Sequence, residues 1–145
     1  TQHLYNIKAD RILDFSANYR FTDSHGNVIG SIRRKGMRSI WKANYEIFDA
    51  AGNHVLQINE ENGWVKVVDA IAGEIPVLGM FTGYLFNPAY LVSRTDGTPI
   101  ARLQKEPAFF EGKFKLEPQT QLSGDEEVRV LLSLLTMTLL ERARG

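Results

Sequence analysis

The sequence predicts an all-β domain with one helix, in the form of an antiparallel β-barrel wrapped around a buried hydrophobic C-terminal helix. Three observations lead to this prediction. A strand–turn–strand pattern occurs three times, the C-terminal region has a strong helical signature, and 43% of the 145 residues are hydrophobic. A chain of this length and composition can bury a core as a single domain, so we treat residues 1–145 as one unit.

The repeated pattern begins at Tyr19, Tyr45 and Tyr90. In each copy an apolar residue follows the tyrosine by two positions, and a glycine follows it by seven. Residues two apart on a strand lie on the same face, and glycine readily adopts the positive φ of a tight turn. The pattern therefore predicts β-hairpins over 19–32, 45–58 and 90–103.

Other segments also have the composition of strands, namely 4–9, 64–69 and 109–116. The stretch 75–93 carries no charge and is nearly long enough to cross a bilayer. However, it contains two prolines and two glycines, and the third hairpin begins inside it. We therefore interpret it as buried strands with a connecting loop, and we expect no transmembrane segment.

Residues 123–144 form the predicted helix. Ser123 and Glu126 have the spacing of a capping box, and Arg142 and Arg144 lie where the helix dipole is negative. The residues from 130 to 140 are uncharged and span about 16 Å as a helix, roughly half of a bilayer core. An apolar helix too short to cross a membrane is expected to be buried in protein, and in an all-β domain the inside of a barrel would enclose it.

These features resemble the tubby C-terminal-like superfamily, and within it the LURP-one-related and phospholipid scramblase-like branch. The residues that carry the resemblance lie at 45–53 (Tyr-Glu-Ile-Phe-Asp-Ala-Ala-Gly-Asn), at 83–90 (Gly-Tyr-Leu-Phe-Asn-Pro-Ala-Tyr) and in the leucine-rich terminal helix. The resemblance implies a closed barrel of about twelve strands around a central helix. It also implies phosphoinositide binding, because tubby domains bind these lipids.

The chain departs from that family pattern in length. We count about eight or nine strands, which is fewer than the resemblance implies. Either the strands are short, or N-terminal strands precede Thr1 and are missing from this chain. In the second case the barrel would be open, or other material would complete its edge.

No set of residues has the spacing of a catalytic or metal site. His3, His25 and His54 lack ligand spacing, and nucleophile elbows, phosphate loops and dinucleotide fingerprints are absent from the sequence. The Asp-x-x-Gly turns lack the further oxygen ligands of a calcium loop. We therefore expect a domain that is not an enzyme and has no cofactor, although a site assembled from distant residues would leave no such pattern.

The strongest candidate site is a basic run. Five cations lie within ten residues, and acidic residues are absent from 24 to 45. Such a patch could bind phosphoinositide or other anionic head groups at a membrane surface, or it could be a solvated edge that discourages strand pairing. The candidate anion-binding residues are Arg33, Arg34, Lys35, Arg38 and Lys42.

Net charge and aromatic residues indicate which classes of partner the domain could bind. The 17 basic and 17 acidic residues cancel, which argues against a nucleic-acid partner. The alternative function is a protein-interaction or scaffold barrel without a lipid ligand, using exposed aromatic residues such as Phe48, Phe109 or Phe110. We expect a cytoplasmic protein, peripheral at the membrane if the lipid hypothesis holds.

Overall fold

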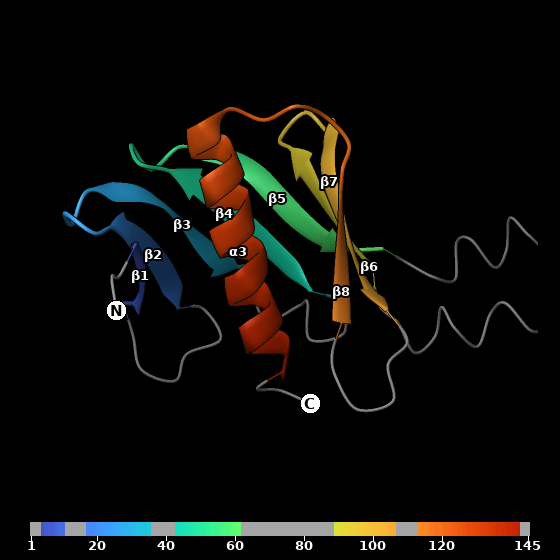
Figure 1. Ribbon diagram of the computed structural model, residues 1–145, viewed down its shortest axis with the longest axis horizontal. Coiled ribbons are helices and arrows are strands. Elements are labelled where there is room, and N and C mark those ends of the chain that lie inside the picture. Colours follow the sequence, from blue (N-terminus) through green and yellow to red (C-terminus); the bar gives the residue numbers. More distant parts are fainter. Residues whose placement is uncertain (1–3, 11–16, 36–42, 62–88, 107–112, 143–145) are drawn as a thin grey trace, which may run out of the picture.

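In the part of the chain that the structure describes, one helix lies across one antiparallel sheet (Figure 1). The computed structural model describes residues 4–10, 17–35, 43–61, 89–106 and 113–142. The eight strands pair in chain order, so every pairing joins neighbours in sequence. The elements are β1 (Tyr5–Ala9), β2 (Asn18–Asp23), β3 (Val28–Arg34), β4 (Asn44–Asp49), β5 (His54–Glu60), β6 (Ala89–Arg94), β7 (Pro99–Glu106), β8 (Lys113–Pro118) and α3 (Gly124–Arg142).

The three predicted hairpins are confirmed as β2–β3, β4–β5 and β6–β7. The predicted strand over 4–9 is β1, and the end of the predicted strand over 109–116 belongs to β8. The predicted strand over 64–69 and most of the uncharged stretch, 75–88, lie outside the described residues. Residues 89–93 of that stretch belong to β6.

The three hairpins share one turn geometry. Gly26, Gly52 and Gly97 have φ values of 86°, 87° and 92°, and each donates its N–H to the carbonyl three residues earlier. In the first two turns an aspartate carboxylate also accepts hydrogen bonds from the asparagine four residues later. The register also shifts by one residue in each hairpin, where the second strand has one extra residue three positions after the turn glycine: Ile29, Val55 or Ile100.

The two faces of the sheet differ in character. We call the face that α3 covers the inner face and the opposite face the outer face. The core lies on the inner face, where side chains such as Phe21, Ile47 and Leu56 are fully buried. From the helix, Val130, Leu134 and Met137 join the same core. Because side chains alternate along a strand, this inner core fixes which residues point to the outer face.

The helix is bound to the sheet by polar contacts as well as by its apolar row. The Tyr45 hydroxyl donates to Glu141 Oε1 at 2.5 Å, and Arg94 Nη1 lies 2.6 Å from Glu126 Oε1. Arg129 Nε donates to the Ile29 carbonyl at 3.2 Å. These contacts bind both ends of α3 to strands that are far apart in sequence, and so they fix its orientation on the sheet.

The expected helix over 123–144 is observed as α3, and its N-terminus is capped as expected, with Glu126 N donating to Ser123 Oγ. However, it is buried along one face rather than on all sides. Leu131, Leu135 and Leu139 are 45%, 51% and 55% exposed. Among the described residues, no helix is both long and apolar enough to cross a membrane.

The sheet is open across the part of the chain that the structure describes. The two terminal strands of the sheet, β1 and β8, each pair with one neighbouring strand. The sequence predicted a closed barrel, and closure would require further pairing along these two edges. Closure of the barrel therefore stays a prediction, whereas the antiparallel sheet covered by a C-terminal helix is confirmed.

Two adjacent leucines of α3 provide a test of its buried face. Leu134 is 4% exposed and Leu135 is 51% exposed. We expect Leu134→Ala to lower the free energy of unfolding by about 2–5 kcal/mol, because it opens a cavity between helix and sheet. Leu135→Ala should change it by about 0.5 kcal/mol or less. Chemical denaturation at low protein concentration measures both values, and equal effects would contradict the observed helix face.

Candidate anion-binding surface

The basic run begins on β3, where Arg33 and Lys35 share one carboxylate on the outer face. Arg33 Nη2 lies 2.8 Å from Glu46 Oε2, and Lys35 Nζ lies 3.6 Å from Glu46 Oε1. Strand pairing explains this contact, because Arg33 and Glu46 are direct partners between β3 and β4. Glu46 directly follows the acid-free segment 24–45, so in the sequence this acid lies just outside the basic run.

Glu46 is held in its charged form by its neighbours. Partial burial raises the pKa of this carboxyl. The hydrogen bond and charge of Arg33, together with the charges of His54 and Lys35, lower the pKa by more than burial raises it. The net result is a pKa below the ordinary glutamate value. Two cations therefore share one stable negative charge, which leaves a net positive charge at this point.

The structure does not place all five predicted cations on one surface. Arg34 points to the inner face, where its guanidinium lies 5.9 Å from the centre of the Tyr45 ring. The pairing of Arg34 with Tyr45 between β3 and β4 accounts for this position. Arg38 and Lys42 lie outside the described residues. The continuous run in sequence is thus divided between the two faces, because consecutive strand residues alternate.

Two further cations, which were not among the predicted site residues, also lie on the outer face. Lys8 of β1 and Arg20 of β2 are direct cross-strand partners and therefore lie side by side on one face. Arg20 is next to the buried Phe21 in sequence, so it points to the outer face, as Arg33 does. The alternation of Arg20 with Phe21 was readable from the sequence, but the pairing with Lys8 required the register.

Lys8 and Arg20 line a hollow in the protein surface of about 460 Å³. Its other lining groups are mostly small polar side chains that can donate or accept hydrogen bonds. One carboxylate, Asp10, is present and accepts the backbone N–H of Asn18 at 2.9 Å. The residues that line the hollow are Asn6, Lys8, Ala9, Asp10, Asn18, Arg20 and Thr22.

Phe48 belongs to the same surface but is only half-exposed. The Arg33 guanidinium lies 4.8 Å from the centre of its ring, and the ring of His54 lies 5.5 Å away. This stacking orients Arg33 and covers part of the aromatic face. Phe109 and Phe110, which were grouped with Phe48 as candidate partner contacts, lie outside the described residues.

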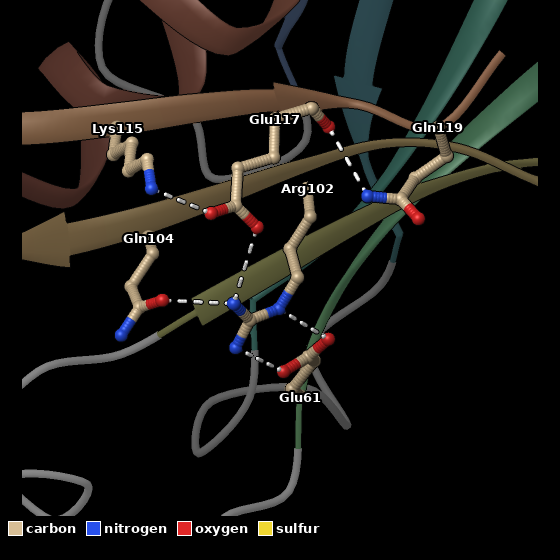
Figure 2. Close-up of polar contacts among 6 residues, drawn as sticks. All are labelled: Glu61, Arg102, Gln104, Lys115, Glu117 and Gln119. Carbon is tan, nitrogen blue, oxygen red and sulfur yellow. Dashed lines mark hydrogen bonds and ion pairs between the residues drawn. The ribbon is translucent and has the colours of Figure 1, made fainter.

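The other half of the outer face carries a neutral ion-pair network (Figure 2). Arg102 donates through Nε and Nη2 to both carboxylate oxygens of Glu61, at 3.0 Å each, and through Nη1 to Gln104 Oε1 at 2.8 Å. Glu117 lies 3.8 Å from Arg102 Nη1 and 3.0 Å from Lys115 Nζ. Two cations here meet two carboxylates, and a bidentate pair of this kind is already satisfied within the protein.

No family model, curated protein or solved structure matches the chain. The resemblance to tubby-like domains therefore stays a prediction, and conclusions about the site must rest on the residues themselves. Within the described ranges, no group of three or more acidic or histidine side chains could hold a metal ion. His25 lies in the first hairpin turn, His54 stacks on Phe48, and His3 lies outside the described residues.

The lowered pKa of Glu46 makes its contribution to stability depend on pH. A carboxyl whose pKa is lower in the folded state stabilises the fold above its unfolded pKa, and it loses that contribution as pH falls through the folded value. We therefore expect Glu46→Gln to reduce the free energy of unfolding at neutral pH. The difference from the unmodified chain should shrink below about pH 4.5, the ordinary glutamate value. Denaturation series at several pH values measure this difference.

The control uses the chain in which Arg33 and Lys35 are both replaced by alanine. In that background Glu46 has lost the two cations that it pairs with, so Glu46→Gln should have a much smaller effect at neutral pH. An undiminished effect in this background would show that the ion pairs do not cause the lowered pKa.

Proposed function

We propose that the domain binds anionic groups, and phosphorylated lipid head groups such as phosphoinositides in particular, on the outer face of β1–β3. The observation that carries the proposal is the direct pairing of Lys8 with Arg20 beside a hollow in the protein surface. We call the four outer cations Lys8, Arg20, Arg33 and Lys35 the basic face. The predicted residues Arg33 and Lys35 thus remain in the site, whereas Arg34 points away from it.

Like charges directly opposite each other destabilise a strand pair. Lys8 and Arg20 occupy such positions at the edge of the sheet, and both are exposed. A bound anion would reverse this penalty, because one phosphate can pair with a lysine and an arginine at once. The arrangement therefore favours binding over stability, which is typical of functional surfaces.

Charge distribution over the outer face supports the same location. On the β1–β4 side, the four cations of the basic face accompany two carboxylates, those of Asp10 and Glu46. On the β5–β8 side, the cations and carboxylates of the Arg102 network cancel. A chain of zero net charge thus presents a local excess of positive charge, and each such residue near an anionic membrane contributes about 1 kcal/mol.

The proposal also agrees with the tubby-like resemblance, because tubby domains bind phosphoinositides. On this proposal the domain is a binding module rather than an enzyme, needs no cofactor and acts as a peripheral protein on cytoplasmic membrane leaflets.

The test is co-sedimentation with vesicles of neutral lipid alone and with added phosphoinositide, at low and high salt. We expect binding to the phosphoinositide vesicles that weakens with salt, and Lys8→Glu/Arg20→Glu should abolish it. The matched control is Lys105→Glu/Lys113→Glu, which changes the net charge equally but lies on β7 and β8. Glu46→Gln should strengthen binding, because it removes a negative charge from the basic face.

A competition arm separates the possible sources of the anion. Soluble inositol phosphate that displaces the protein from vesicles would support a head-group site, whereas equal competition by inorganic phosphate would indicate general anion binding. Equal loss of binding in the control variant would show that only net charge matters. Binding to none of the vesicles would contradict the proposal and favour the protein-interaction alternative.

A further inference from the structure

The exposed side of α3 carries an apolar surface that no described strand covers. Leu131, Leu135 and Leu139 follow each other at intervals of four residues and are about half exposed. We call these three residues the leucine stripe. Residues four apart are neighbours on a helix, so the stripe is continuous over about 12 Å. In Figure 1 the helix lies across one side of the sheet, with its far side turned away from the strands.

The leucine stripe is separate from the row of α3 residues that packs into the core. Val130, Leu134 and Met137 already contact the sheet and are almost completely buried. The stripe faces away from that row, and the half-buried Val128 and Leu132 border it. A helix with apolar residues on both sides requires a second partner surface, because exposed leucines in a row favour association.

Charged residues at the two ends of the stripe indicate what that partner is. Asp125 and Glu127, in the first turn of α3, and Arg142, in its last turn, are exposed. In an antiparallel pair of such helices centred on Leu135, Leu131 of one helix meets Leu139 of the other. The acidic first turn of each helix then lies beside Arg142 of the other, and the helix dipoles are opposed.

We propose that α3 is a dimerisation surface, on which a second copy of this chain packs antiparallel through the leucine stripe. Charge complementarity selects this partner, because the acidic first turn and Arg142 of one helix face the oppositely charged ends of an antiparallel copy. With a two-fold axis at Leu135, the leucine stripes of the two helices meet at the centre. The acidic first turn of each helix then lies beside Arg142 of the other at both ends. Such a dimer leaves the basic face free on each subunit, on the opposite side of the sheet, so this proposal does not depend on the proposed function.

Sedimentation velocity over a range of protein concentrations tests the proposal. We expect a reversible monomer–dimer equilibrium, which Leu135→Glu abolishes. The matched control is Leu4→Glu, because Leu4 is 61% exposed and precedes β1, away from the helix. A monomer at every concentration, or a dimer that survives Leu135→Glu, would overturn the proposal. Equal loss of the dimer in the control would also overturn it.

Charge reversal tests the antiparallel arrangement. Glu127→Arg or Arg142→Glu alone should raise the dimer dissociation constant by about three- to tenfold, because the two-fold axis repeats each contact. The combined variant should bring it back close to the original value, since the exchanged charges again face each other. Failure of the combined variant to recover dimerisation would overturn the arrangement. Unfolding curves at low concentration verify that each variant is folded, because both changes oppose the helix dipole.

Discussion

The packing of α3 against one face of the sheet is the interaction on which the rest of the structure depends. Val130, Leu134 and Met137 bury a face that eight locally paired strands could not cover alone. Once this face is inside, alternation along the strands fixes which residues point outward. The helix therefore determines the orientation of the charged residues, although it contacts few of them.

The outer face is divided into two halves of different charge. The Arg102 network joins the later strands and satisfies its charges internally, which fits a stabilising role. The earlier strands place Lys8 opposite Arg20 without an equivalent set of carboxylates. This contrast is why we assign ligand binding to the first strands. The leucine stripe gives α3 a separate role on the opposite side, where a second copy of the chain would bind.

Local patterns made most of the fold predictable. The repeated tyrosine and glycine spacing identified three hairpins, and the capped apolar segment identified α3, because both depend on residues close in sequence. The site was harder to predict from the sequence, because it depends on pairing between strands. The position of Lys8 beside Arg20 follows from register, and the pairing of Arg33 with Glu46 brings an acid into a run that had none. The exposure of Leu135 was missed because an apolar composition does not show which helix side contacts the sheet.

Cysteine labelling along α3 tests this account most directly, since the chain has no cysteine of its own. Single cysteines at positions 131, 134, 135 and 137 would be reacted with a thiol reagent at low protein concentration. The account predicts rapid labelling at 131 and 135 and slow labelling at 134 and 137. Equal protection at all four positions would show that the helix is enclosed on every side. Equal reactivity would show that it does not pack on the sheet, and either result would contradict the account.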